Sequence, residues 1–333
     1  MTETPLLEVE GLKTHFPIRD GVFGQVTGHV RAVDGVDLRI RRGTSFGLVG
    51  ESGSGKSTLG RTVLGLYQPT AGTVRFDGRD INAIGRRGRR ALRPKMQLVF
   101  QDPYGSLNPR VRVGDAIGEA LLAHGLVRRS ELRDAVLEVM RICGLAPYQY
   151  ARYPHEFSGG QRQRIGIARA LALKPELIVA DEPVSALDVS IQAQIINLLQ
   201  DLQQEMGLAL LFIGHDLSVI EYLCDRVVVL YLGRVMETAT AAELYRNPRH
   251  PYTRALLDAA PIPRPRARPA RMVLKGDLPS PLNPPSGCVF RTRCPYALPA
   301  CAEAAPVLRE AGPGHAVACI REDLDLTRPP AAA

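Results

Sequence analysis

The chain has no hydrophobic run long enough to cross a membrane. Its longest uncharged apolar stretches are LALLFIG, which begins at Leu208, and VVVLYLG, which begins at Val227. Both fall far short of the ~20 residues that a spanning helix needs. The acidic N-terminal sequence MTETPLLEVE also lacks the apolar segment of a signal peptide. We therefore expect a cytoplasmic protein that does not itself enter the bilayer.

Cysteine is also scarce, with six residues in a chain of 333. This number is too small for a disulfide scaffold, and the missing signal peptide favours a reducing compartment. Four of the six nevertheless fall close together near the C-terminus. In a reducing compartment, such a group indicates a metal site before it indicates cross-links.

The rest of the composition is that of a folded globular protein, with 45% apolar and 23% charged residues. Lys and Arg number 42 against 34 Asp and Glu, which leaves a net charge of +8. That excess fits nucleic acid, an anionic membrane surface or a phosphate-bearing ligand, and does not choose among them. An Arg-rich run at 86–93 has no interleaved aromatic residues for stacking bases, so we expect a solvated face there, with anionic lipid as the alternative.

Proline marks a change in the character of the chain. Ten of the 26 prolines lie in the first 245 residues, and 16 lie between Pro248 and Pro330. Before Asn247, short β-rich apolar runs alternate with helical patterns, which is typical of an α/β sheet covered by helices. The expected strands are 44–49, 96–100, 177–180, 208–213 and 226–231. No internal repeat occurs, so a tandem duplication is excluded.

A phosphate-binding loop follows the first of these strands. The sequence GESGSGKS at 50–57 matches the pattern G-x-x-x-x-G-K-S, between the strand SFGLV and a helical stretch. Glycines let the loop wrap a phosphate with backbone N–H groups, and the helix N-terminus adds a favourable partial charge. Lys56 should reach the β- and γ-phosphates, and the Ser57 hydroxyl should bind Mg²⁺. A glycine-rich turn without a ligand is the alternative, which this context disfavours.

A pair of acids ends another expected strand, in the sequence LIVADEP. We expect Asp181 to hold the Mg²⁺ shell and Glu182 to polarise the water that attacks the γ-phosphate. Taken alone, two acids at a strand end are more often a solvated turn. The phosphate-binding loop earlier in the chain favours the catalytic interpretation.

A third motif, FSGGQ at 157–161, precedes the helical stretch RQRIGIARALAL. A Ser-Gly-Gly turn before a helix presents N–H groups and a hydroxyl to an anion, although Ser158 could equally be only a helix cap. With Gln101 after a strand, SALD at 185–188 and His215 after LLFIG, residues 7–245 resemble the nucleotide-binding subunit of an ATP-binding cassette (ABC) transporter. The resemblance implies an ABC-type α/β fold with a RecA-like core sheet, an antiparallel β subdomain and a helical subdomain at about 104–172.

The resemblance also implies residue roles. Gln101 would sense Mg²⁺ and the attacking water and link to the membrane subunits, and His215 would contact the γ-phosphate. Asp188 would couple the two ATP sites of a head-to-tail dimer, in which Ser158 and its neighbours face the partner's phosphate-binding loop. Phe16 would stack on adenine, although a lone Phe is more often a core residue. The expected ATP-binding set is Phe16, Gly50, Glu51, Ser52, Gly53, Ser54, Gly55, Lys56, Ser57, Thr58, Gln101, Ser158, Gly159, Gly160, Gln161, Asp181 and Asp188, with Ser57, Gln101 and Asp181 around Mg²⁺.

Longer stretches outside these motifs narrow the resemblance. FQDPYGSLNPR, YPHEFSGGQRQR, PVSALDVS and NPRHPYTRALL are similar to the dipeptide and oligopeptide importer ATPases, most closely to their second, F-type, ATPase. This implies a D-type ATPase partner, two membrane permeases and, indirectly, a solute-binding protein, at the cytoplasmic face of the membrane. A nickel or other small-solute importer of the same subfamily stays open as an alternative. A soluble ABC ATPase acting on ribosomes or nucleic acid, and a non-hydrolysing ATP-binding module, are less favoured.

The C-terminal cysteines are Cys288, Cys294, Cys301 and Cys319, with the spacing C-x₅-C-x₆-C-x₁₇-C. Structural zinc usually shows closer cysteine pairs, whereas a [4Fe–4S] cluster tolerates varied spacing. The C-terminal extension of the peptide importer ATPases matches these positions, and some members carry such a cluster, so we favour [4Fe–4S] over zinc and over free thiols. Cys143 and Cys224 lie in helical stretches and are expected to be buried packing residues.

These observations predict an ABC ATPase domain over 1–246. A Pro- and Cys-rich C-terminal extension is predicted over 247–322, where the cluster would act as a staple for a segment with little apolar periodicity. A disordered tail is predicted over 323–333.

Overall fold

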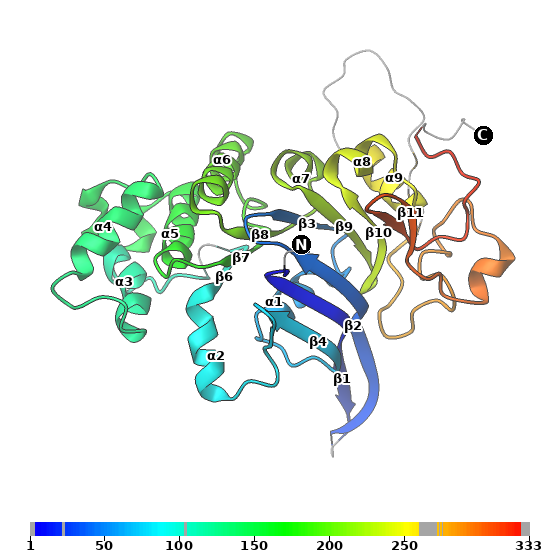
Figure 1. Ribbon diagram of the computed structural model, residues 1–333, viewed down its shortest axis with the longest axis horizontal. Coiled ribbons are helices and arrows are strands. Elements are labelled where there is room, and N and C mark those ends of the chain that lie inside the picture. The colour runs from blue at the N-terminus through cyan, green and yellow to red at the C-terminus, as the bar shows by residue number, and fades with distance from the viewer. Residues whose placement is uncertain are drawn as a thin grey trace, which may run out of the picture. The chain divides into compact units, whose positions relative to one another are not determined.

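The computed structural model describes residues 4–21, 24–102, 105–259, 272, 274 and 276–327 (Figure 1). The chain forms two compact units. The first contains the N-terminal residues up to Leu6 together with 40–45 and 83–213. The second contains 7–39, 46–82 and the chain from Gly214 onward.

The first unit is built on three parallel strands in the order β8-β7-β6. Met96 of β6 pairs with Leu177 of β7, and Leu177 pairs with Ala209 of β8. Every residue of β7 and β8 is buried, as expected for strands covered on both faces. The strand bounds are β6 Met96–Val99, β7 Leu177–Asp181 and β8 Ala209–Gly214.

Helices fill the rest of the first unit, and α3, α4 and α5 lie together in green in Figure 1. In α4, Val136 and Met140 are both fully buried, one turn apart on the same face. No residue of the Arg-rich helix α2 is buried, which agrees with the predicted solvated face. The helix bounds are α2 Arg86–Leu92, α3 Val113–Ala123, α4 Leu132–Ile142, α5 Gly159–Leu171 and α6 Val189–Met206.

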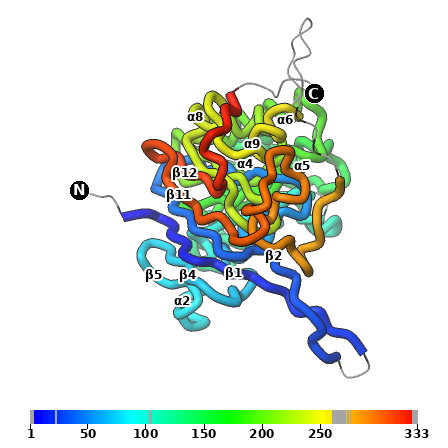
Figure 2. The backbone as a smooth tube through the Cα atoms, turned by 90° about the vertical axis from the view of Figure 1, so that its right-hand side faces the viewer, coloured from blue at the N-terminus to red at the C-terminus, as the bar shows by residue number. Residues whose placement is uncertain are grey.

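The second unit contains a four-stranded sheet in the order β2-β1-β4-β5 (Figure 2). In the antiparallel β1–β4 pair, Leu7 lies opposite Phe76 and Val9 opposite Val74, and all four side chains are buried. Alternate residues therefore form one apolar face of this sheet. The strand bounds are β1 Leu7–Asp20, β2 Gln25–Ile40, β4 Ala71–Phe76 and β5 Arg79–Asp80.

A further set of strands in this unit runs in the order β11-β12-β10-β9-β3. β3 and β9 are parallel, and the remaining pairs are antiparallel. Strands β11 and β12 come from the C-terminal extension, so the extension lengthens the sheet at the edge of β10. The bounds are β3 Ser45–Val49, β9 Arg226–Tyr231, β10 Arg234–Thr240, β11 Arg309–Gly312, β12 His315–Val317, α1 Lys56–Val63, α7 Leu217–Leu223, α8 Ala241–Arg246 and α9 Pro251–Ala259.

The five predicted strands are present, each within two residues of its predicted bounds. Cys143 and Cys224 are buried, as predicted. The folded extension continues beyond its predicted end at residue 322, because Leu326 packs against Ala255 of α9. The other part of the predicted tail, 328–333, lies outside the described residues, and among the described helices none is long and apolar enough to span a bilayer.

Candidate nucleotide site and cysteine pocket

The loop 50–57 leads from β3 into α1, and its backbone requires glycine at two positions. Gly50 and Gly55 have φ values of +152° and +103°. A Cβ at Gly50 would lie 2.2 Å from the carbonyl oxygen of Leu230, and one at Gly55 would lie 2.1 Å from that of Ala32. At both glycines the loop packs against the backbone of a neighbouring segment, which leaves no room for a side chain at either position.

Lys56 is folded back over this loop. Its side chain is buried, and its Nζ donates hydrogen bonds to the carbonyl oxygens of Gly50, at 2.7 Å, and Glu51, at 3.0 Å. The Ser54 N–H donates to the Glu51 carbonyl at 3.1 Å, so the loop closes on itself. The ammonium group is thus held within the arc of the loop, where it can meet a phosphate.

Glu51 is held by two residues of the C-terminal part of the chain. The Tyr252 hydroxyl accepts a hydrogen bond from the Glu51 N–H at 2.8 Å. The Arg293 guanidinium donates to both carboxylate oxygens of Glu51, at 2.5 and 3.1 Å. Neither contact is predictable from the sequence, because no local pattern links residues that lie 201 and 242 positions apart.

Phe16 lies on β1 and is only half-buried. Its ring packs edge-on against Tyr67, with 5.3 Å between the ring centroids and an angle of 84° between the planes. One aromatic partner and partial exposure leave ring surface for a further contact.

In the first unit, Glu182 follows Asp181, the buried last residue of β7. Its N–H donates to the Ile213 carbonyl at 2.9 Å, and its backbone is left-handed, with φ +46°. The Gln101 Nε2 donates to the Glu182 carboxylate at 3.0 Å and lies 3.5 Å from the Ser185 hydroxyl. The structure therefore brings Gln101, Glu182 and Ser185 together at the carboxyl ends of β6 and β7.

The FSGGQ motif begins helix α5. Ser158 is the N-cap, with its hydroxyl accepting from the Gln161 N–H at 3.4 Å and its own N–H donating to the Gln161 side chain at 3.1 Å. A Cβ at Gly160 would lie 2.3 Å from the Ile191 side chain. The structural role considered for Ser158 is thus confirmed, and the exposed helix start remains available for an anion.

Predicted Asp188 and His215 stand at helix starts. Asp188 occupies the N-cap position of α6 and is exposed. His215 is exposed and directly precedes Asp216, which caps α7 through a 2.9 Å bond from the Ser218 N–H. Predicted Ser52 and Gly53 are exposed in the phosphate-binding loop, while Ser57 and Thr58 lie in the first turn of α1.

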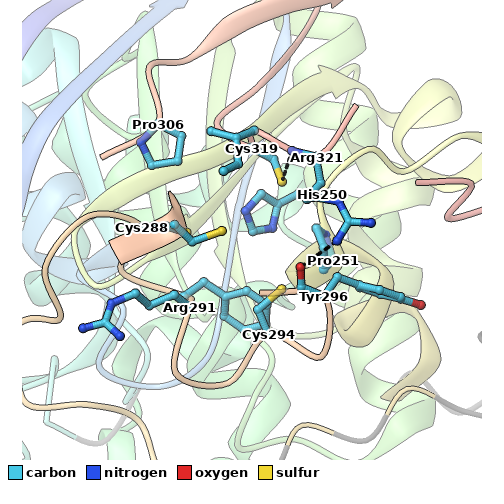
Figure 3. Close-up of a pocket in the computed structure, with 12 residues that line it drawn as sticks. His250, Pro251, Cys288, Arg291, Cys294, Tyr296, Pro306, Cys319 and Arg321 are labelled. Carbon is cyan, nitrogen blue, oxygen red and sulfur yellow. Dashed lines mark hydrogen bonds between the residues drawn. The ribbon is translucent and has the colours of Figure 1, made fainter. Parts of the chain in front are cut away.

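The four C-terminal cysteines line one pocket, together with His250, Phe290 and Arg321 among others. Figure 3 shows the sulfur atoms of Cys288, Cys294 and Cys319 pointing into the same space beside the His250 ring. Burial raises the pKa of the Cys288 and Cys319 thiols, and raises that of Cys294 to about 12. Across the described part of the chain, no group of three or more His, Cys, Asp or Glu side chains is arranged to hold a metal ion.

Two family models match the chain. That of the ABC transporter family matches residues 33–185, and that of the oligopeptide/dipeptide transporter C-terminal region matches 236–301. A putative peptide import ATP-binding protein of Brucella ovis is 56% identical over 97% of this chain and 100% of its own length. The chain belongs to the ATP-binding proteins of peptide ABC transporters. Its site residues thus sit in an ABC ATPase.

Other relatives agree with this ABC ATPase assignment. The oligopeptide transport ATP-binding proteins AppF of Bacillus subtilis and OppF of Escherichia coli are each 54% identical, over 94% and 96% of this chain and 96% of each relative. The dimeric post-hydrolysis structure of the cassette MJ0796, bound to ADP and Pi, matches with a TM-score of 0.63 at 29% identity, over 71% of this chain and 98% of its own. The structure of cbiO1 from Clostridium perfringens matches with a TM-score of 0.62 at 29% identity, over 73% of this chain and 91% of its own.

Proposed function

We propose that this ATPase powers the import of dipeptides or oligopeptides through a membrane permease by ATP-driven closure of a dimer. The observation that carries the proposal is the near full-length similarity to peptide-import ATP-binding proteins, which includes the C-terminal region. A nickel or other small-solute cargo is not favoured by these relatives. Action on ribosomes or nucleic acid is not favoured either.

We propose that the loop 50–57 binds the phosphates of ATP. Support comes from its glycine-dependent backbone and from the Lys56 ammonium held within its arc. Ser57, Asp181 and Gln101 would surround Mg²⁺, Phe16 would stack on adenine, and His215 would contact the γ-phosphate. These are the roles that the cassette motifs assign to the positions they occupy.

Glu182 is the proposed general base. A carboxylate that accepts a proton from water must be held at a fixed place while keeping its lone pairs accessible. Gln101 holds one carboxylate oxygen, and the left-handed backbone fixes the direction of the side chain. The amide of Gln101 donates this hydrogen bond without bringing a charge next to the carboxylate.

We propose that each active site needs a second ATPase. Ser158, Gly159, Gly160 and Gln161 would face the phosphate-binding loop of the partner, and Asp188 would couple the two sites. Because Ser158 caps α5 while staying exposed, the helix start can serve both the fold and an anion. A D-type homologue is the proposed partner, bound with this chain to two permeases at the cytoplasmic face of the membrane.

Copurification tests this assembly at low cost. A tagged chain expressed with its genomic neighbours should bring down two hydrophobic permeases and a second ATPase after detergent extraction. Recovery of ribosomes or nucleic acid in place of permeases would contradict the proposal. Vanadate-sensitive ATPase activity that rises with added peptide, and not with added nickel, would support a peptide cargo.

We further propose that Cys288, Cys294, Cys301 and Cys319 hold a [4Fe–4S] cluster. The donor set fits, because four thiols line a single pocket and such clusters take four cysteine thiolates. Zinc is the alternative, although structural zinc sites usually show closer cysteine pairs than these four. The cluster would supply cross-links among segments of the extension that share little apolar core.

Metal analysis after anaerobic purification tests the cluster. We expect about four iron and four sulfide per chain, lost together in a Cys288→Ser and Cys319→Ser double variant. One zinc ion per chain would contradict the cluster and indicate a zinc site in its place. A metal-free chain whose extension resists proteolysis would contradict both kinds of metal site.

A further inference from the structure

The side chain of Arg293 is only 8% exposed, and its charge is compensated chiefly by Glu51 of the phosphate-binding loop. Its two terminal nitrogens donate to the two carboxylate oxygens of Glu51, at 2.5 and 3.1 Å. Its Nε is buried and has no hydrogen-bond partner among the described residues. Contact with Glu51 raises the pKa of Arg293 further above its usual range, so the guanidinium stays charged. A buried cation of this kind is retained only when its partner stays in place.

Arg293 is itself held by a cluster of aromatic rings that joins the extension to the sheet. Its guanidinium carbon lies 6.0 Å from the Tyr231 ring centroid. Phe290, three residues earlier, packs on Tyr231 and Tyr252 with centroid distances of 5.3 and 5.2 Å. Tyr252 in turn accepts the Glu51 N–H. Both the backbone and the carboxylate of Glu51 are therefore fixed by one cluster of packed side chains.

Charge gives this arrangement a consequence for nucleotide binding. A carboxylate in a loop that binds a triphosphate repels the ligand, because like charges a few ångströms apart interact strongly at a partly buried site. The bidentate pair with Arg293 offsets that repulsion and keeps the Glu51 side chain in one direction. The extension thereby contributes to the electrostatics of the loop through Glu51.

We propose that Arg293 is a positioning residue for ATP binding, which holds and neutralises Glu51 so that the phosphate-binding loop keeps its binding-competent form. The inference rests on the proposed role of residues 50–57 as the phosphate-binding loop. It makes the C-terminal extension part of the nucleotide site, in addition to any role of the cysteine pocket.

A double-mutant cycle on the full-length chain tests this inference. The affinity for a fluorescent ATP analogue with Mg²⁺ is measured for the wild type, Arg293→Ala, Glu51→Gln and the double variant. Arg293→Ala should weaken binding by about 10-fold, within the usual range of coupling between two sites. Whatever effect Glu51→Gln has by itself, Arg293→Ala should cost much less affinity in the Glu51→Gln background than in the wild type, because the carboxylate that it would leave uncompensated is already gone.

Arg254→Ala is the matched control. Arg254 also forms an ion pair of low exposure in the C-terminal part of the chain, and its partner is Asp258 of the same helix rather than a residue of the loop. It should lower the melting temperature without changing nucleotide affinity. If Arg293→Ala does not fold, Arg293→Lys, which keeps the charge but loses the bidentate contact, replaces it with a smaller expected loss.

Two results would overturn the inference. One is an Arg293→Ala affinity no lower than that of Arg254→Ala. The other is an equal loss in the wild-type and Glu51→Gln backgrounds, which would mean that Arg293 does not act through Glu51. Lys56→Ala distinguishes failure of the proposed phosphate-binding loop from failure of the role of Arg293. If Lys56→Ala binds the analogue as tightly as the wild type, the loop assignment fails and this inference fails with it.

Discussion

At the scale of single residues, Glu182 combines an unusual backbone with a fixed side chain. Its φ of +46° lies in the left-handed region, which costs a non-glycine residue about 1 kcal/mol or more. Two hydrogen bonds maintain this conformation. The Glu182 N–H donates to the Ile213 carbonyl, and the Gln101 side chain donates to the Glu182 carboxylate. A strained backbone directly after β7 agrees with a residue whose side-chain direction matters more than its contribution to stability.

Glu182→Gln should therefore leave ATP and Mg²⁺ binding intact and lower turnover in the assembled complex by ~10²–10⁴-fold, the range for removal of a positioned base. It should also trap a closed, ATP-bound dimer, visible by gel filtration. Lys56→Ala should fail earlier, at ATP binding, because it removes the charge that meets the phosphates. Turnover near that of the wild type for Glu182→Gln would refute the role of this carboxylate.

The glycines of the phosphate-binding loop allow a second prediction at this scale. Gly55→Ala should lower the free energy of unfolding by about 1–3 kcal/mol. The new methyl group would meet the Ala32 carbonyl, and residue 55 has a left-handed backbone. Gly166→Ala in α5 is the control, since a Cβ there meets no atom within 4 Å. The control should be neutral or slightly stabilising in urea unfolding. Equal midpoints for the two variants would contradict the close packing described for the loop.

At the scale of elements, the start of α9 depends on a buried neutral histidine. The His250 Nδ1 accepts a hydrogen bond from the Tyr252 N–H at 3.0 Å, while the backbone N–H of His250 donates to a carboxylate oxygen of Glu237 of β10 at 3.0 Å. Burial lowers the pKa of His250 to about 3. The neutral ring thus caps the helix that carries Tyr252 to the phosphate-binding loop.

This shift predicts how the stability of α9 depends on pH. The folded pKa lies below the unfolded value of about 6.5, so the stability contribution is complete above pH 6.5 and falls as the pH drops from there toward 3. At pH 5.5 the loss is about 1.4 kcal/mol. Hydrogen exchange of 251–259 should show this loss in the wild type and not in His250→Asn, which keeps an acceptor without titrating in this range. An identical pH dependence in both proteins would exclude His250 as the cause.

The elements also show what sequence patterns can predict. The strands and the three motifs were predicted because each is local: an apolar run, a glycine spacing or a helix cap lies within about ten residues. The pairing of β12 with β10, the Arg293–Glu51 contact and the left-handed backbone of Glu182 were not predicted. They depend on which distant segments pack together, and composition carries no signal for that choice. The predicted tail from residue 323 was too long for the same reason, because Leu326 finds its partners in α9 and at Met272.

At the scale of the whole molecule, the proposed composite site predicts that the isolated chain is largely monomeric and hydrolyses ATP poorly. Each phosphate-binding loop would lack the Ser158 and Gly160 of a partner. Adding the cognate ATPase and permeases should restore turnover. Light scattering measures the oligomeric state of the sample. A confirmed monomer that hydrolyses ATP at the rate of the complex would rule out the composite site.

The most direct test of the central proposal is peptide uptake into proteoliposomes that contain both ATPases and both permeases. With ATP on the side of the membrane that carries the ATPases and the solute-binding protein on the other side, a labelled peptide should accumulate on the ATPase side with the wild-type chain. Uptake should be abolished by Glu182→Gln, although that variant still assembles and binds ATP. Uptake that persists with Glu182→Gln, or ATP hydrolysis by the wild-type complex that moves no peptide, would contradict the account.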